Sequence, residues 1–258
     1  MFAAEAAGLN ALASAAGDTL IIPRVLHTGP LPSPPNGRPS SFIVMEHLDL
    51  GAGAAGRLSQ RALGAGLATV HAAPPADSRG FGFASDNWIG GSPQPNGWME
   101  SWVDFFRERR LLHMNRLLAS PGSPVDRMVR QLAAPGALES FFDDGEEVIR
   151  PSLIHGDLWS GNMSIAGATR SPGGAPGWSI LDPAAYYAHD EAEFGMSWCA
   201  SFGGEFWEGY RSLIPEAPGF AKRRPLYELY HIMNHAVMFG GGYVGQAEAL
   251  LARLTRGL

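Results

Sequence analysis

The feature that most constrains this chain is a set of three polar residues placed at the ends of short apolar runs near its middle. Asp157 follows the first run, Asn162 comes five residues later, and Asp182 ends the next apolar run. Kinase catalytic loops have this spacing: one aspartate accepts the proton of the substrate hydroxyl, while an asparagine and a second aspartate hold Mg²⁺. The alternative is that His155 and Asp157 only cap a turn. The spacing favours phosphoryl-transfer chemistry over this structural alternative.

The residues around these polar groups predict a β-hairpin. Residues 162–165 and 178–181 are its two expected strands, joined by a loop rich in Gly and Pro. Such a hairpin would keep Asn162 and Asp182 at its two near ends, where one hard cation such as Mg²⁺ can bind oxygen atoms of both. Trp159 is open to two interpretations, because it could pack under the loop or stack on a sugar.

The residues in and around the motif narrow the choice of protein family. The chain resembles the fructosamine kinases, also called ketosamine-3-kinases, over essentially its whole length. The resemblance is carried by His155–Asn162 (HGDLWSGN), Asp182–Glu191, Gly80–Phe83, Gln94–Trp98, Phe105–Leu111, Leu229–His235 and Phe239–Tyr243. The first of these segments, with its tryptophan, is more specific than the general kinase pattern, which aminoglycoside and choline kinases also approximate. Residues 191–199 look most like the plant and green-algal branch of the family.

The resemblance implies an activity and its reactants. It implies an ATP-dependent kinase that phosphorylates the 3-hydroxyl of ketosamines such as ribulosamine, erythrulosamine or fructosamine, on glycated proteins or as free compounds. The cofactors implied are ATP and Mg²⁺, and the role implied is repair of glycated proteins. Two alternatives stay open: an inactive pseudokinase or nucleotide-binding remnant, and a small-molecule kinase of the aminoglycoside or choline type.

The resemblance also implies a fold and further site residues. The expected fold is α+β and protein-kinase-like, with a truncated small lobe at 1–48 and a complete helical large lobe at 49–258. At the end of the small lobe, the backbone of Glu46, His47 and Leu48 would meet the adenine of ATP. The possible substrate contacts are Trp159, Gln94 and Asn96, although the last two are equally well explained as turn-forming or packing residues.

Lysine is almost missing from the chain, and this has a mechanistic consequence. Lys222 is the only lysine, whereas kinases of this fold hold the ATP phosphates with a lysine on the third strand of the small lobe. Residues 1–9 resemble the helix that follows that strand, so we expect the chain to begin after the phosphate-binding hairpin. Glu5 would then be the helix glutamate that pairs with the absent lysine; the alternative is an exposed glutamate favoured by the helix dipole. We therefore expect the chain as given to be a weak or inactive kinase, and an upstream extension to restore turnover.

Composition limits the setting in which the chain works. A net charge of −6 argues weakly against nucleic acid as a partner. Cys199 is the only cysteine, which excludes an internal disulfide and favours a reducing compartment. No apolar run approaches the length needed to span a bilayer, and no secretory signal is visible. We expect a cytoplasmic protein, or a plastid one if an upstream transit peptide is missing; the oligomeric state is left open.

Two further patterns have competing explanations. Residues 51–56 spell G-x-G-x-x-G between an expected strand and helix, as in dinucleotide-binding folds. That motif also needs an acidic residue at the end of the next strand, but Asp77 lies in a Pro-rich loop, so we interpret the glycines as a linker. His189, Asp190, Glu191 and Glu193 do not have zinc-site spacing, and we expect them to hydrogen-bond the segment after Asp182 in place.

Periodicity predicts several elements beyond the motif. A helix is expected at 2–16, strands at 20–25 and 41–45, and a long final helix with a buried face. The expected buried face consists of Leu226, Tyr230, Met233 and Val237. An aromatic stripe at 98–106 is expected to join the core, and the mixed-charge run 107–110 is expected to be a solvated helix face.

Overall fold

The computed structural model describes residues 1–32, 40–51, 58–76, 79–143, 149–167 and 175–258. Most of the G-x-G-x-x-G segment and much of the loop between the two predicted hairpin strands lie outside these described residues. The chain forms two compact units. Unit 1 contains Met1–Pro75, Ser152–Tyr186 and Ser197–Pro215, and unit 2 contains Ala76–Pro151, Tyr187–Met196 and Glu216–Leu258.

Unit 1 combines helices with short strand pairs. Its helices are α1 (Phe2–Ala16), α2 (Gln60–Ala72), the 3₁₀ turn η3 (Ser160–Asn162), α6 (Ser197–Ala200) and α7 (Gly204–Arg211). Its strands are β1 (Val25–Pro30), β2 (Ser41–Met45), β5 (Ser152–Ile154), β6 (Met163–Ala166) and β7 (Gly177–Ile180). The strand β8 (Tyr186–Ala188) begins at its last residue.

The predicted hairpin is present. Strands β6 and β7 pair antiparallel, with Met163 opposite Ile180 and Ala166 opposite Gly177. The bounds differ from the predicted ones by a single residue at each end. The backbone N–H of Leu181 donates to the carbonyl of Asn162 at 2.9 Å, so the pairing continues to the residue directly before Asp182.

The N-terminal elements agree with the sequence in part. The helix expected at 2–16 and the strand expected at 41–45 are confirmed as α1 and β2. The strand expected at 20–25 is wrong, because the regular strand β1 only begins at Val25. Before it, Ile21 forms an isolated parallel bridge with Ser179, and Pro23 has no N–H with which to continue a ladder.

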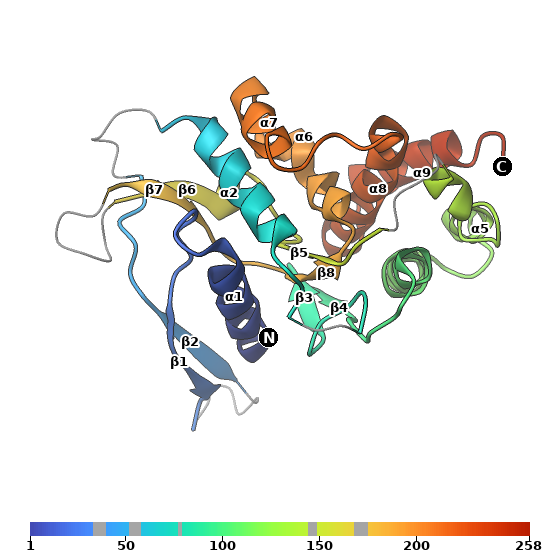
Figure 1. The fold of residues 1–258 in the computed structure, drawn as a ribbon. Helices are drawn as coiled ribbons and strands as arrows, with labels where there is room; N and C mark the ends of the chain where they lie inside the picture. Colours follow the sequence, from blue (N-terminus) through green and yellow to red (C-terminus); the bar gives the residue numbers. More distant parts are fainter. Residues whose placement is uncertain (33–39, 52–57, 77–78, 144–148, 168–174) are drawn as a thin grey trace. The chain divides into compact units, whose positions relative to one another are not determined.

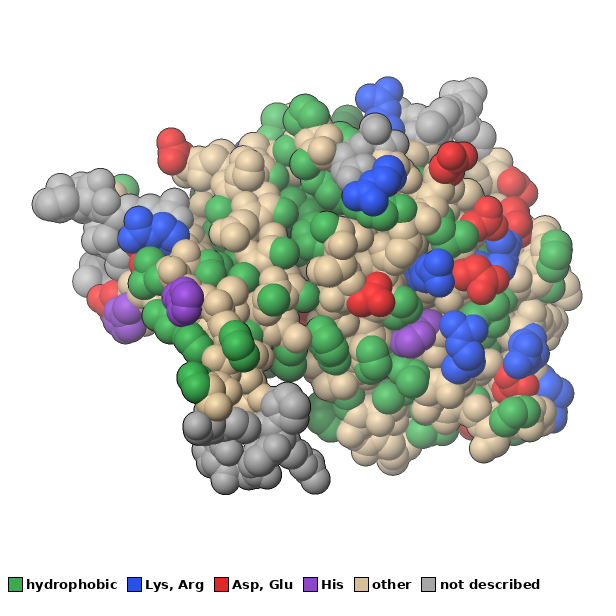
Figure 2. Space-filling view, turned by 90° about the horizontal axis from the view of Figure 1, so that it is seen from below, with side chains coloured by type: hydrophobic (Ala, Val, Ile, Leu, Met, Phe, Trp, Pro, Cys, Tyr) green, Lys and Arg blue, Asp and Glu red, His purple; other side chains and the backbone are tan. Residues whose placement is uncertain are grey.

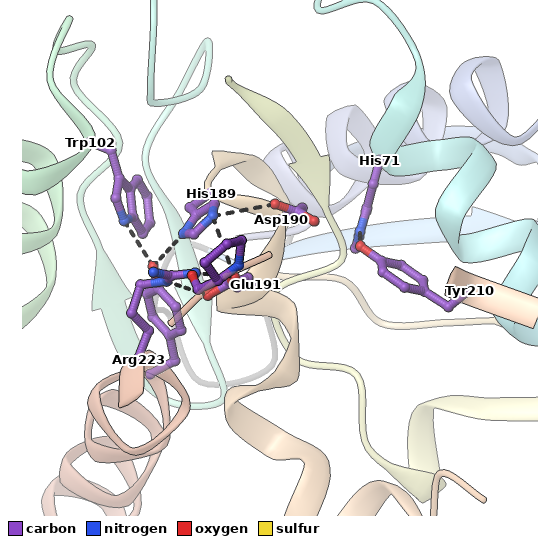
Figure 3. Close-up of polar contacts among 9 residues, drawn as sticks. His71, Trp102, His189, Asp190, Glu191, Tyr210 and Arg223 are labelled. Atoms are coloured by element: carbon purple, nitrogen blue, oxygen red, sulfur yellow. Dashed lines mark hydrogen bonds and ion pairs between the residues drawn. The ribbon is translucent and has the colours of Figure 1, made fainter. Parts of the chain in front are cut away.

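Helices α2 and α7 approach each other very closely in unit 1 (Figure 1). A Cβ atom on Gly64 would lie 2.0 Å from the carbonyl oxygen of Phe206, and one on Gly209 would lie 2.1 Å from that of Arg61. Only glycine fits such contacts, since any side chain would collide with backbone. The buried pair His71 and Tyr210 joins the same two helices by a 2.8 Å hydrogen bond (Figure 3).

Unit 2 is mostly helical. Its helices are α3 (Trp102–Phe105), the π-helical turn η1 (Phe106–Leu111), α4 (Leu112–Leu118), α5 (Pro124–Leu132), the 3₁₀ turns η2 (Glu139–Phe142) and η4 (Asp190–Met196), α8 (Phe220–Phe239) and α9 (Gly242–Leu254). Strands β3 (Asn87–Ile89) and β4 (Ser92–Gln94) form an antiparallel hairpin. On the expected face of α8, Leu226, Tyr230 and Met233 are buried, as predicted, while Val237 is half-buried.

The aromatic and arginine-rich segment of unit 2 corrects one expectation. Trp102, Phe105 and Phe106 are buried, which confirms their predicted place in the core. Arg110 is also completely buried, so the run 107–110 is not simply a solvated face. The π-helical turn changes the usual 3.6-residue register, and Arg110 donates to the carbonyl of Pro95 and to the Asn96 side chain, each at 2.7 Å.

A buried polar cluster holds the segment after β8 (Figure 3). The guanidinium of Arg223 donates to both carboxylate oxygens of Glu191, at 2.7 and 2.6 Å. Close by, the His189 ring and the Tyr227 hydroxyl are 2.6 Å apart, and Trp102 Nε1 donates to the same hydroxyl at 3.1 Å. Burial lowers the pKa of His189, so a neutral ring is favoured. The cluster bears out the expectation for His189 and Glu191, which fix this segment by hydrogen bonds.

Among the described residues, no helix combines the length and the hydropathy that crossing a membrane requires. On the face drawn in Figure 2, basic (Lys or Arg) and acidic side chains are interspersed among hydrophobic and neutral ones.

Candidate active site

The candidate catalytic loop leaves the buried strand β5 in unit 1 and turns sharply at Gly156. This glycine has a φ of +80°, and a Cβ atom there would lie 2.5 Å from the carbonyl oxygen of Ala184. Both observations require glycine, because a left-handed conformation and a close backbone contact coincide. The turn presents Asp157 in a half-exposed position, while the next residue, Leu158, is fully buried and anchors the loop.

His155 ties this loop to the end of β7. Its Nε2 lies 2.8 Å from the carbonyl oxygen of Leu181, and its Nδ1 accepts from the backbone N–H of Asp157 at 3.3 Å. A carbonyl can only accept, so the proton belongs on Nε2. In this neutral form the buried ring connects the residue before Asp182 to the backbone of Asp157. This geometry agrees with the predicted scaffold role of His155.

Asn162 brings the two aspartates together. Its Nδ2 donates to the carbonyl of Asp157 at 2.9 Å, and it lies 3.4 Å both from Asp157 Oδ2 and from the carbonyl of Asp182. The side chain is buried, with 6% exposed. With the nitrogen turned towards both aspartates, the Oδ1 atom receives no hydrogen bond from any described residue.

Asp182 has an unusual backbone. Its φ is +55°, in the left-handed region that non-glycine residues seldom adopt, and it precedes Pro183. Such strain is found most often at functional sites, where the surroundings hold it in place. The side chain is exposed. The Asp182 carboxylate is exposed, and the Asn162 amide oxygen has no donor among the described residues. Both are hard oxygen ligands of the kind that suits Mg²⁺, so these residues fit this ion.

Glu5 of α1 lies within electrostatic reach of Asp182. Burial raises the pKa of Glu5, and the negative charge of Asp182 raises this pKa further. The helix packs on the segment after Asp182, since a Cβ atom on Gly8 would lie 3.3 Å from the Ala185 Cβ. The two carboxylates therefore face a common region that favours a cation. The only lysine, Lys222, is in unit 2, where it donates to the carbonyl of Ser140.

We predict that Glu5→Gln raises the thermal unfolding midpoint at pH 7. A carboxyl whose pKa is higher in the folded chain adds stability below its ordinary value of 4.5, and this contribution is lost as pH rises through the raised value. Glu5→Gln cannot ionise, so it avoids this loss of stability at pH 7. Its higher unfolding midpoint relative to wild type should therefore shrink towards pH 4. Thermal melts followed by circular dichroism from pH 4 to 8 measure this difference in midpoint, with Glu100→Gln, at an exposed position, as the control. Identical midpoints for wild type and Glu5→Gln across this range would contradict the repulsion from Asp182.

Helix α6 packs against η3 beside the candidate catalytic loop. It carries Cys199, whose pKa is raised to about 11 by burial and by the charge of Asp157. The thiol is therefore protonated at neutral pH, as expected for an inert rather than a reactive cysteine. Trp198, the residue before it, is 45% exposed. Sequence reasoning did not find this neighbourhood, because α6 lies far from Asp157 in sequence and carries no catalytic motif.

Trp159 is exposed rather than packed under the loop. It is 40% exposed, and the position that a Cβ atom would take on Gly161 is 2.3 Å from its ring. The ring thus lies over a residue that must be glycine. This geometry leaves room for the interpretation that Trp159 contacts a ligand.

The predicted hinge follows β2. Glu46 is held by two contacts with Arg24: its N–H donates to the Arg24 carbonyl at 2.8 Å, and its carboxylate accepts from the Arg24 N–H at 3.3 Å. Leu48 is buried and His47 is exposed. The backbone groups of His47 and Leu48 make no hydrogen bond to another described residue. Their role in binding adenine stays a prediction.

Gln94 and Asn96 lie in unit 2 and are completely buried. Both side-chain amides donate to Asn87 Oδ1 at 2.8 Å, and Gln94 Oε1 accepts from the Tyr230 hydroxyl at 2.5 Å. The structure therefore places these amides in an internal network together with Arg110. Their predicted contact with substrate is not tested by these distances and stays a prediction.

Comparison with known proteins identifies the family. A family model described as fructosamine kinase matches residues 1–256. The chain belongs to the fructosamine kinase family. Among its relatives, the rice chloroplastic protein-ribulosamine 3-kinase is 41% identical over 254 residues, which cover 97% of this chain and 68% of the rice protein. The Arabidopsis thaliana protein of the same name is 39% identical, covering 97% and 71%. The mouse ketosamine-3-kinase is 31% identical, covering 99% and 84%.

Solved structures agree on the fold. A "putative fructosamine-3-kinase" from Thermobifida fusca is 27% identical, with a TM-score of 0.75, and the match covers all of this chain and 81% of that one. An aminoglycoside phosphotransferase is 16% identical, with a TM-score of 0.53 over 98% and 84% of the two chains. The second likeness concerns the fold alone. Together they confirm the predicted α+β, protein-kinase-like fold.

Proposed function

We propose that this fructosamine kinase family member transfers the γ-phosphate of ATP to the 3-hydroxyl of a ketosamine. The observation that carries the proposal is the position of the Asn162 amide, which contacts both Asp157 and Asp182 within unit 1. These contacts support a site in which Asp157 is the general base and Asn162 and Asp182 are the oxygen ligands that phosphoryl transfer requires. The names of the rice and mouse relatives support the acceptor class.

Each residue of the loop has a defined role in this proposal. Asp157 orients the 3-hydroxyl and accepts its proton as the new O–P bond forms and the bond to the departing ADP breaks. Asn162 Oδ1 and the Asp182 carboxylate would hold Mg²⁺. When bound, this ion neutralises charge on the phosphate oxygens. His155 keeps Asp157 and the end of β7 in register, and such positioning is a large part of catalysis in this reaction class.

The remaining assignments follow the family. In this proposal residues 1–48 act as a small lobe and 49–258 as the large one, with Glu46, His47 and Leu48 next to adenine and Glu5 near the phosphates. Trp159 contacts the sugar, with Gln94 and Asn96 as further candidate contacts. The acceptor is a glycated protein or a free ketosamine. The chloroplastic relatives of rice and Arabidopsis support a plastid location alongside the cytoplasmic one.

The test is direct phosphorylation of defined acceptors. The chain is incubated with MgATP and Nα-acetyl-lysine carrying ribulose, erythrulose or fructose on its ε-nitrogen, and the product is analysed by ³¹P NMR. Phosphate on O3 of any of these supports the proposal, and the matching lysine without a sugar is the control. ATP binding without any phosphorylated product would instead select a nucleotide-binding remnant. Phosphorylation of kanamycin or choline, but of no ketosamine, would select a small-molecule kinase.

A further inference from the structure

Among the described residues other than glycine, only two have a left-handed backbone, and both are in unit 1. They are Asp182, with a φ of +55°, and Ser201, with a φ of +58°. Such conformations are found most often at functional sites, where the surrounding structure maintains them. Asp182 is a candidate metal ligand, whereas Ser201 lies outside the catalytic loop and the hairpin. The segment around Ser201 is therefore a second place where backbone strain indicates a function.

Ser201 directly follows α6, the short helix that packs against η3. The residues on either side of it are anchored: Ala200 is buried, and the Phe202 ring stacks on that of Phe206 with centroids 3.9 Å apart. The chain turns between these two anchors, and it does so at Ser201. For a residue with a Cβ atom, a left-handed conformation is disfavoured by a factor of roughly 5–30, so other contacts have to maintain it.

The side-chain amide of Gln60 supplies such contacts. Its Nε2 donates to the carbonyl of Ser201 at 3.1 Å, and its Oε1 accepts from the backbone N–H of Gly203 at 2.8 Å. One amide thus bridges two backbone groups of the same turn. Gln60 is the first residue of α2, and the close packing of α2 on α7 gives this amide a fixed position.

The same end of α2 is also joined to the hairpin of the candidate metal site. Trp178, on β7, donates from Nε1 to the carbonyl of Ser59 at 3.1 Å. Ser59 directly precedes Gln60, and β7 leads to Asp182. The beginning of α2 therefore contacts both segments that carry a strained residue: the strand before Asp182 and the turn after α6.

We propose that Gln60 is a positioning residue for the metal site: by holding Ser201 in its left-handed conformation, it keeps α6 against η3, the turn that contains Asn162. The Asn162 amide lies 2.9–3.4 Å from atoms of Asp157 and Asp182, so a small shift of η3 would weaken these contacts. This inference rests on the proposed role of Asn162 as a ligand of Mg²⁺. Residues that orient metal ligands without touching the metal commonly change its affinity 10–100-fold when removed. Because Gln60 acts through a helix, a smaller effect is expected.

The experiment measures MgATP affinity by calorimetry in wild type, Gln60→Ala, Ser201→Gly and the double variant. Gln60→Ala should weaken MgATP binding about fivefold or more, because the strained conformation is no longer held. In the double variant, Ser201→Gly should restore most of the affinity, since glycine adopts a positive φ without steric cost. Arg61→Ala is the matched control: this next residue of α2 pairs with Glu208 of α7 and not with the turn.

The rate of Cys199 alkylation by iodoacetamide at pH 8 reports on α6 itself, in the absence of metal and nucleotide. Cys199 lies on α6 and is half-buried. If α6 loosens its contact with η3, the thiol becomes more accessible. Gln60→Ala should therefore be alkylated faster than wild type, while Arg61→Ala and the double variant should react at nearly the wild-type rate.

The outcomes separate this inference from the proposed function. Equal MgATP affinity and equal alkylation rates in Gln60→Ala and Arg61→Ala would overturn the inference, even if Gln60→Ala melts at a lower temperature. A loss of affinity without faster alkylation, or one that Ser201→Gly does not reverse, would overturn it as well. If wild type binds MgATP but phosphorylates no ketosamine, the proposed function fails while the affinities still decide the role of Gln60. If wild type does not bind MgATP, both proposals are overturned.

Discussion

Asp157→Asn should lower the rate of ketosamine phosphorylation by roughly 10²–10⁴-fold, the range typical for loss of a general base. Asparagine has the shape of aspartate but cannot accept the proton of the 3-hydroxyl. The fold should survive, because Asn162 donates to the backbone carbonyl of Asp157 and His155 accepts from its N–H, and neither contact needs the carboxylate. Initial rates with ribulosyl-lysine, measured in a form of the protein known to turn over, give the result.

Two controls make this result interpretable. Asp18→Asn removes an exposed carboxylate from the same unit and should leave the rate unchanged. In Asp157→Asn itself, the pKa of Cys199 should fall below its value of about 11, because the charge of Asp157 contributes to that value. Faster alkylation of Cys199 by iodoacetamide at pH 8 would verify that the local charge has gone. A loss of activity smaller than about tenfold would exclude Asp157 as the base.

The sequence predicted the centre of the site because the information there is local. The polar groups of 155–162 and Asp182 flank one β-hairpin, and hairpin pairing fixes how its ends meet. The observed pairing of β6 with β7 differs from the prediction by one residue at each end. The helix at 2–16 was also predictable, since a run of alanines ended by a glycine specifies a helix with little help from tertiary contacts.

Other features depend on tertiary contacts that no local pattern encodes. Arg110 belongs to a charged run, yet it is buried because its guanidinium replaces water with the Pro95 carbonyl and the Asn96 amide. Ile21 pairs with Ser179, more than 150 residues away, instead of forming the predicted strand. The influence of Asp157 on Cys199 likewise depends on the packing of α6 against η3. Such contacts become visible only when the chain is folded.

The strain at Asp182 shows how sequence and structure combine at the site. The motif predicts an aspartate at the end of the second strand, but not its left-handed backbone with φ +55°. With this φ, Asp182 does not have the β conformation that would continue strand β7. Because Asn and Asp tolerate it better than other non-glycine residues, substitutions at this position must be chosen to separate the effect of charge from that of backbone.

Asp182→Ala should abolish Mg²⁺-dependent ATP binding more severely than Asn162→Ala. Asp182 offers a full negative charge to a divalent ion, whereas Asn162 offers a neutral oxygen. Asp182→Asn is the matched variant, because it removes the charge while tolerating the positive φ, so its affinity for MgATP should fall nearly as far as that of Asp182→Ala.

Calorimetric titration of MgATP into wild type and the three variants gives the affinities, and the same titrations with EDTA isolate the part that depends on metal. If charge is what matters, the ranking is wild type, Asn162→Ala, then the two Asp182 variants, and EDTA removes most of the differences. A loss in Asp182→Ala that is absent in Asp182→Asn would mean that backbone strain, and not metal binding, explains the effect. Equal affinities of wild type and Asp182→Ala would show that Asp182 is not a metal ligand. In that case the contact of Asn162 with Asp182 would serve only to shape the loop.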